Sequence, residues 1–351
     1  MLTRAGSRRR PRLRLGLLVL GLAAIVVLIV VLASSGSGSG RHGGRTAATT
    51  HRGGTARGAR PALAARPPAL RARTVGRLSS AEQDAAAAAV GGNVVLMGGL
   101  TAADTSRADV VVLRSGREAA HGTLPSPLHD AAAAALGGSV YFFGGGNLEV
   151  GNAGIVRVDP ASGHASPAGR LPVGVSDVGA AAIGSTAYVV DGYTGTRPVD
   201  TVAAWSPGRR ARVVAHTPQP LRYAAVAGAG GRLLIVGGST PTAASRDVLS
   251  LDPRTGRVLR IGRLPRPLTH AAAVTLGKYV YVIGGRGSTP GTPTDRILAI
   301  DPATGRVTSA GRLPRALSDV SAAASGAGIV VAGGRDATGA RAEILELAPR
   351  K

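Results

Sequence analysis

Six copies of one sequence pattern, spaced 46 to 49 residues apart, constrain the fold of this chain more than any other feature. Each copy has an Ala-rich or Gly-rich segment, a short apolar segment and a pair of glycines, as in "HAAAVTLGKYVYVIGG", except that the third copy has Asp in place of the first glycine. The pairs stand at Gly98-Gly99, Gly144-Gly145, Asp191-Gly192, Gly237-Gly238, Gly284-Gly285 and Gly333-Gly334. A period of roughly 40–50 residues is typical of β-propeller blades, so we predict an all-β fold with six blades.

The second half of each copy predicts two more strands. Segments such as "RILAIDPATG" read as a third strand that ends in an Asp-Pro turn, and a fourth strand follows, ending in sequences such as "GRLP". The Ala-rich segments have high helix propensity, but the innermost strand of a blade lies where the sheets converge and needs small side chains. We therefore expect four-stranded blades with the Ala-rich segments as inner strands.

The two ends of the folded part complement each other. The last copy stops after its third strand, "AEILELAPRK", whereas the folded part begins with "RTVGRLSS" at 73–80, which matches the fourth strands. We expect residues 73–78 to pair with the strand near residues 343–347 and to complete the sixth blade. This pairing covers a sheet edge that is otherwise exposed.

The order of small inner strand, apolar strand, double glycine, third strand and "DPxTG" turn resembles the kelch repeat over residues 73–351. It is similar to kelch propellers of the galactose-oxidase central-domain kind, in a membrane-anchored bacterial form. The chain departs from the family pattern in its outer strands, where Trp205 is the sole Trp. Some relatives are copper radical oxidases that need a Cys, which this chain lacks; others are sugar mutarotases or epimerases, which need only polar groups.

The N-terminal region divides into three parts. Residues 1–14 carry six Arg, and residues 15–33 are 19 residues without a charge, about 28 Å long as a helix and just able to span a bilayer. We expect a basic cytoplasmic segment, a transmembrane helix, and then a disordered Gly/Arg/Pro-rich linker at 34–72 that contains few large apolar residues. A secreted protein, released by cleavage of a signal peptide, is the alternative.

Positive charge is concentrated in the residues that precede the predicted propeller. The net charge is +23, and residues 1–73 hold 14 Arg and no acidic residue, which leaves 42 − 14 = 28 basic and 19 acidic residues, or +9, for the remainder. The arginines are not interleaved with the aromatic residues that stack on bases, so we do not expect a nucleic-acid partner.

Candidate ligand-binding residues occupy one register, fourteen positions before each double glycine. They are Asp84, Asp130, Asp177, Tyr223, His270 and Asp319. The propeller fold predicts that they ring one mouth of the central channel, on the same face as the residues after the double glycines, which include Tyr193, Arg286 and Arg335. They form either a partly acidic funnel for a ligand or a set of loop caps, since Asp commonly bonds backbone N–H groups in turns.

Two functions of different classes are consistent with this pattern. The first is a membrane-tethered, extracytoplasmic recognition or scaffold module, monomeric, that binds a protein or glycan at the cell envelope through its loop face. The alternative is a carbohydrate-active enzyme, similar to mutarotases or epimerases, that uses polar residues at the channel mouth. We expect no catalytic set, metal site or cofactor, because the chain has no Cys, no metal-ligand spacing of His, no G-x-S-x-G and no phosphate-binding loop.

Overall fold

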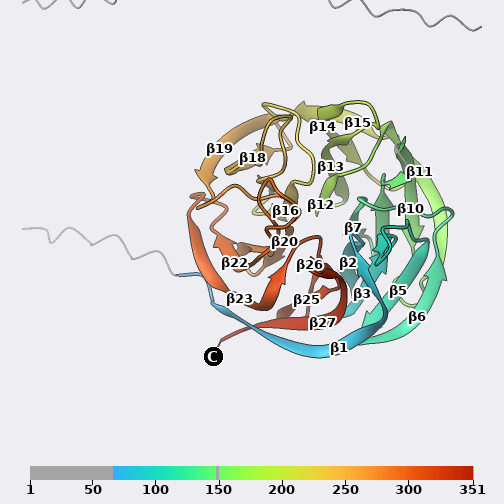
Figure 1. Ribbon diagram of the computed structural model, residues 1–351. Coiled ribbons are helices and arrows are strands. Elements are labelled where there is room, and N and C mark those ends of the chain that lie inside the picture. Colours follow the sequence, from blue (N-terminus) through green and yellow to red (C-terminus); the bar gives the residue numbers. More distant parts are fainter. Residues whose placement is uncertain (1–65, 148–149, 351) are drawn as a thin grey trace, which may run out of the picture. The chain divides into compact units, whose positions relative to one another are not determined.

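A computed structural model describes residues 66–147 and 150–350 of the chain. These residues form six antiparallel sheets around a central axis, numbered as blades 1 to 6 in chain order (Figure 1). The predicted all-β propeller is therefore confirmed. None of the described residues forms a helix long and apolar enough to cross a membrane. The predicted basic segment, transmembrane helix and most of the predicted linker lie outside the described residues.

Every blade has four main strands, named in order from the axis outward. Blade 1 is β2 (Ala86–Val90), β3 (Asn93–Met97), β5 (Asp109–Arg114) and β6 (Arg117–Thr123). Blade 2 is β7 (Ala132–Leu136), β8 (Ser139–Phe143), β10 (Val150–Val158) and β11 (Ala165–Val175). Blade 3 is β12 (Gly179–Ile183), β13 (Thr186–Tyr193), β14 (Pro198–Trp205) and β15 (Arg212–His216).

Blades 4 to 6 follow the same order. Blade 4 is β16 (Ala225–Ala229), β17 (Arg232–Val236), β18 (Asp247–Asp252) and β19 (Arg257–Arg263). Blade 5 is β20 (Ala272–Leu276), β21 (Tyr279–Ile283), β22 (Thr294–Ile300) and β23 (Val307–Leu317). Blade 6 is β24 (Ser321–Ser325), β25 (Gly328–Ala332), β27 (Gly339–Pro349) and β1 (Leu70–Gln83).

The Ala-rich segments are the inner strands, as predicted, and the reason is the lack of space near the axis. A Cβ on Gly179 of β12 would lie 2.3 Å from the Val226 side chain of β16, and one on Gly228 would lie 2.5 Å from the Ala182 carbonyl oxygen. Larger side chains on these strands would push neighbouring blades apart. Packing therefore overrides the helix propensity of Ala.

The hydrophobic core is divided among the six blade interfaces. Each of the six buried clusters joins two neighbouring blades, and together they close the circle. Trp205 of blade 3, for example, packs edge-on against Tyr141 and Phe143 of blade 2, with ring centroids 4.9 and 5.7 Å apart. Stability therefore depends on contacts between blades as well as on hydrogen bonds within them.

The N-terminal strand completes blade 6, which confirms the predicted ring closure. β1 pairs antiparallel with β27, with Arg73 opposite Glu346 and Arg77 opposite Glu343. The strand begins at Leu70, earlier than the expected start at residue 73. Leu70 is fully buried in the cluster between blades 5 and 6, and this burial accounts for the longer strand.

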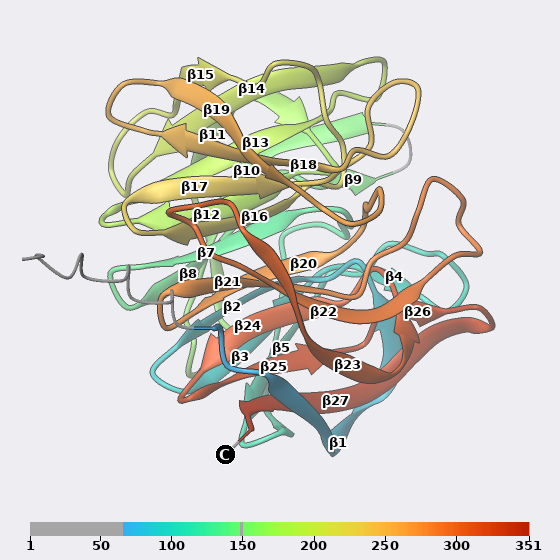
Figure 2. The same ribbon diagram turned by 90° about the vertical axis from the view of Figure 1, so that its left-hand side faces the viewer.

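The connections between second and third strands all emerge on one side of the propeller. Three of them carry short extra strands, β4 (Leu100–Thr101), β9 (Gly146–Asn147) and β26 (Arg335–Asp336). Figure 2 shows these three strands on the same side of the molecule. We call this side the ring face, because the residues described next lie there.

Candidate functional site

The six residues of the predicted ring share one unusual backbone conformation. Their φ angles lie between 53° and 59°, in the left-handed region that non-glycine residues rarely adopt, and they are Asp84, Asp130, Asp177, Tyr223, His270 and Asp319. Asp and His adopt this conformation more readily than most residues, but Tyr has no such preference. The repeated geometry therefore belongs to the connection into each inner strand.

A chain of backbone hydrogen bonds links the ring residues from blade to blade. The N–H of Asp84 donates to the carbonyl oxygen of Asp319 (3.0 Å), and Asp319 donates in turn to His270 (3.0 Å). The chain continues from His270 to Tyr223 (3.2 Å), from Tyr223 to Asp177 (2.9 Å) and from Asp177 to Asp130 (2.7 Å). The left-handed conformation thus has a structural purpose, because it turns each peptide toward the neighbouring blade.

The ring lies on the face that was predicted from the repeat. In every blade, the residue before the ring position pairs with the residue after the double glycine. The pairs are Gln83–Leu100, His129–Gly146, Ser176–Tyr193, Arg222–Ser239, Thr269–Arg286 and Ser318–Arg335. The ring residues and the residues after the double glycines therefore share one mouth of the channel.

Two of the four ring carboxylates are paired with arginine. Arg222 donates through Nε to Asp177, and Arg286 Nη1 lies 3.9 Å from Asp319 Oδ2. Arg286 was among the predicted site residues, but Arg222 was not. The only sequence signal for Arg222 is its place directly before the ring position. Only one other copy has a basic residue type at this place, namely His129. The mouth is thus less acidic than the sequence suggested.

The other two carboxyls of the ring, those of Asp84 and Asp130, have raised pKa values, which favour the protonated, neutral form. Burial, followed by the charges of Asp130 and Asp319, raises the pKa of Asp84 well above its usual value. Burial also raises the pKa of Asp130 to about 8, with further contributions from Asp177 and Asp319. The hydroxyl of Tyr223 donates to Asp130 Oδ2 at 3.4 Å. A proton near Asp84 and Asp130 limits the repulsion among four carboxyls around one axis.

His270 adds a neutral ring to the channel mouth. Burial and the nearby Arg286 and Arg222 lower its pKa to about 3. Its imidazole stacks on the Tyr223 ring, with centroids 3.7 Å apart and planes 23° from parallel, and its Nε2 lies 2.7 Å from Arg286 Nη2. Because the guanidinium of Arg286 can only donate hydrogen bonds, the Nε2 atom of His270 accepts this one.

The remaining predicted residues lie farther from the axis. The guanidinium carbon of Arg222 lies 4.2 Å from the centre of the aromatic ring of Tyr193. Tyr193 therefore contacts the six residues at the channel mouth through Arg222. Arg335 instead contacts Gln83 and Asp104, at 3.2 and 3.1 Å. The six ring residues themselves line a cavity of only about 110 Å³. Pockets for small organic ligands are usually about 300–1,000 Å³, so this cavity is too small for a sugar.

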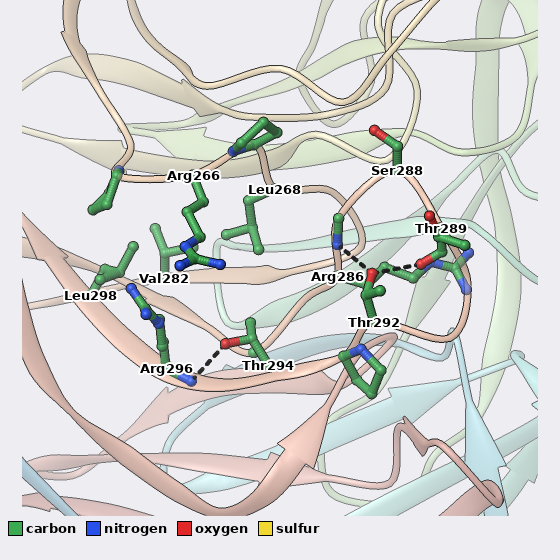
Figure 3. Close-up of a pocket in the computed structure, with 15 residues that line it drawn as sticks. Arg266, Leu268, Val282, Arg286, Ser288, Thr289, Thr292, Thr294, Arg296 and Leu298 are labelled. Atoms are coloured by element: carbon green, nitrogen blue, oxygen red, sulfur yellow. Dashed lines mark hydrogen bonds between the residues drawn. The ribbon is translucent and has the colours of Figure 1, made fainter.

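A much larger groove, which the sequence reasoning missed, opens on the ring face between blades 4 and 5. It has a volume of about 760 Å³ and lies between the loop before β20 and the connection from β21 to β22. Figure 3 shows Arg266 and Arg296 extending into the same space from opposite sides, over apolar walls that include Leu268, Val282 and Leu298. Among the described residues that line it, none is Asp or Glu. We call it the basic groove.

The fold and the ring define a six-bladed β-propeller with four-stranded blades, closed by its N-terminal strand. Residues 267–314, which run from the loop before β20 into β23, match the family model of the Kelch motif. This match and the six-bladed arrangement together support the kelch-repeat propeller that the sequence pattern suggested. No curated protein matches the chain.

The raised pKa of Asp130 predicts a pH-dependent effect of one substitution. Between about pH 4 and pH 8 the folded state holds a proton on Asp130 that the unfolded state has released, so folding stability falls as pH rises through this window. Asp130→Asn keeps the shape of the neutral carboxyl and has no such dependence. At about 1.4 kcal/mol per pH unit across this window, we expect it to raise the free energy of unfolding by up to about 5 kcal/mol at pH 8 and to leave it unchanged at pH 4.

Urea denaturation at the two pH values checks this expectation. Asp159→Asn is the matched control, because Asp159 lies in the turn between β10 and β11, away from the ring, and its pKa is lowered by hydrogen bonds from Ser162 and Ala161. The control should show no gain at pH 8. An Asp130→Asn variant that loses stability at pH 8 would instead mean that Asp130 is ionised and needed as a charge.

Proposed function

We propose that this protein is a membrane-tethered recognition module whose propeller binds an acidic segment of a partner protein in the basic groove. Kelch propellers commonly serve as scaffolds for protein interactions. The single observation that carries the proposal is the groove itself, because two exposed arginines face each other there without a lining carboxylate.

Carboxylates of a partner would supply the missing counter-charges. Arginine binds carboxylates through paired N–H donors, and such charge-assisted bonds are stronger than neutral ones. The walls of Pro265, Pro267, Leu268 and Pro293 offer apolar surface for neighbouring side chains of the same segment. The groove is also within the size range of pockets that bury a ligand. Arg286, which contacts the ring residues His270 and Asp319, lines the inner end of the groove.

An enzyme acting on a carbohydrate has less support. The ring cavity of about 110 Å³ cannot enclose a hexose, and the perturbed carboxyls there are explained by their burial and mutual repulsion. A recognition function needs only an accessible groove with suitable charge. We therefore favour binding over catalysis.

The tether is proposed from the sequence. Residues 15–33 are apolar enough to span a bilayer, and the Arg-rich residues 1–14 favour a cytoplasmic N-terminus. The propeller would then lie outside the cytoplasm, at the end of a linker. Mass spectrometry of the membrane fraction tests this: an intact N-terminus supports the tether, whereas a mature N-terminus near Ser34 would make the protein a secreted one.

We expect Arg266→Glu with Arg296→Glu to weaken binding of acidic peptides at least tenfold. Each charge-assisted hydrogen bond contributes about 1.5–3 kcal/mol, and tenfold in affinity corresponds to about 1.4 kcal/mol. Fluorescence anisotropy with labelled Glu-rich and Asp-rich peptides measures the change.

The matched control is Arg209→Glu with Arg210→Glu. These two arginines are exposed on the connection between β14 and β15, on the face opposite the ring, and their replacement changes the net charge equally. Equal losses in both variants would indicate attraction by net charge alone. Binding of sulfated oligosaccharides but of no peptide would make the partner a glycan and contradict the proposal.

A further inference from the structure

Blade 3 contains the one interruption of the double-glycine pattern. Asp191 stands where the other five copies have the first glycine, and it keeps the left-handed backbone conformation with φ 57°. Its side chain is buried, with the residue only 3% exposed. A charged residue type has thus replaced the smallest residue at a position inside the fold.

The Asp191 carboxyl is only half satisfied by the protein. Oδ1 accepts a hydrogen bond of 2.5 Å from the Thr217 hydroxyl, whereas Oδ2 has no hydrogen-bond partner among the described residues. Burial raises the pKa of this carboxyl well above its usual value, and Asp200 adds to that effect. Buried polar atoms are nearly always paired, so an unpaired carboxyl oxygen needs an explanation.

Asp191 lines a cavity of about 290 Å³ between blades 2 and 3. The walls are apolar side chains from β11, β13, β14 and β15, namely Leu171, Val173, Val175, Val189, Val199 and Val213. Charged groups stand at the same cavity: Arg197 is exposed, and Asp200 is paired with His216 at 3.1 Å. The cavity therefore combines an apolar body with one buried carboxyl.

The cavity is the counterpart of the basic groove in a different blade pair. Pro172 and Pro265 hold the same place in the "GRLP" segments, and Asp191 corresponds to Gly284, which lines the basic groove. Equivalent spaces between neighbouring blades thus have different linings. Between blades 4 and 5 the space is lined by arginines, without a carboxylate among the described residues, and between blades 2 and 3 it contains a buried carboxyl.

We propose that the cavity between blades 2 and 3 binds a small organic cation, a primary ammonium on an apolar body, with Asp191 Oδ2 accepting a hydrogen bond from the ammonium. The valine and leucine walls cover the hydrocarbon part, and Asp200 adds a second carboxylate near the opening. The propeller itself is net positive, at +9 beyond residue 73, so a general attraction for cations does not account for such binding. This site does not depend on the function proposed for the basic groove.

Cyclohexylammonium and cyclohexanol are suitable probes, because they have similar size and differ in charge. Isothermal titration calorimetry with the full-length protein should show that the amine binds at least tenfold more tightly than the alcohol. Asp191→Asn should remove at least tenfold of the amine affinity and leave the alcohol affinity unchanged. Asp191→Gly, which restores the repeat, should do the same and serves if the Asn variant folds poorly.

Asp159→Asn is the control variant, since Asp159 lies in the exposed turn between β10 and β11 and its replacement changes the charge equally. It should bind both probes as the unmodified protein does. Equal affinity for amine and alcohol would overturn the proposal, because the carboxyl would then play no part in recognition. So would the absence of amine binding at millimolar concentration, because Asp191 Oδ2 would then have no cationic partner.

Discussion

Replacing Leu70 and Leu78 together with alanine is expected to lower the free energy of unfolding by about 4–10 kcal/mol. Leu→Ala in a core costs about 2–5 kcal/mol, and the two effects should add because the residues lie in different clusters. Leu70 belongs to the cluster between blades 5 and 6, and Leu78 to the cluster between blades 6 and 1. This loss is comparable to the whole stability of a typical domain, about 5–15 kcal/mol.

Chemical denaturation followed by circular dichroism measures the effect. Leu259→Ala is the matched control: it makes the same change on the outer strand of blade 4, where Leu259 is 41% exposed. The control should change stability by no more than about 0.5 kcal/mol. If the double variant unfolds at the same denaturant concentration as the control, β1 is dispensable and the ring does not need closure.

Gly237→Ala is expected to destabilise the protein by about 1–3 kcal/mol more than Gly231→Ala, because only the first substitution forces a close contact. Both glycines have positive φ, +65° and +73°, so both substitutions carry the penalty of about 1–2 kcal/mol for an L-residue in that conformation. The two positions differ in the room that is available for a Cβ atom. A Cβ on Gly237 would lie 2.1 Å from the Leu268 carbonyl oxygen, whereas one on Gly231 would meet nothing within 4 Å.

The Leu268 carbonyl cannot easily move away. It accepts a hydrogen bond of 2.9 Å from the N–H of Gly238, so the loop before β20 is fixed to the double glycine. Urea denaturation of the two variants isolates the effect of close approach from the effect of φ. Equal destabilisation would mean that the glycine is needed for its φ alone and that the blade can widen there.

The features that could be predicted from sequence are those in phase with the repeat. The period indicated the blade number, and the common register of residues such as Asp84 and His270 placed them at one mouth of the channel. Ring closure followed from the missing fourth strand of the last copy. Each of these inferences needs only the comparison of equivalent positions, because equivalent positions in a propeller have equivalent places in space.

The features that could not be predicted arise from contacts between positions that are not equivalent. Arg222 pairs with Asp177 of the preceding blade, and Arg266 meets Arg296 across a groove. Such pairs depend on side-chain direction and on the length of one particular loop. Asp191 was visible in the sequence as a departure from the repeat, but only the structure reveals its unpaired oxygen and the cavity beside it.

The pairing of β1 with β27 also sets the order in which the propeller can be completed. Leu70, at the start of β1, lies opposite Pro349, at the end of β27. Blades 1 to 5 can form their sheets as the chain grows, but blade 6 waits for the synthesis of β27, and until then β1 lacks its main partner strand. Closure brings together segments at the greatest sequence separation in the domain, a step that is slow and leaves a sheet edge open to wrong partners in the meantime. The last strand of the propeller, β27, therefore determines when the exposed edge of β1 is covered in the newly made protein.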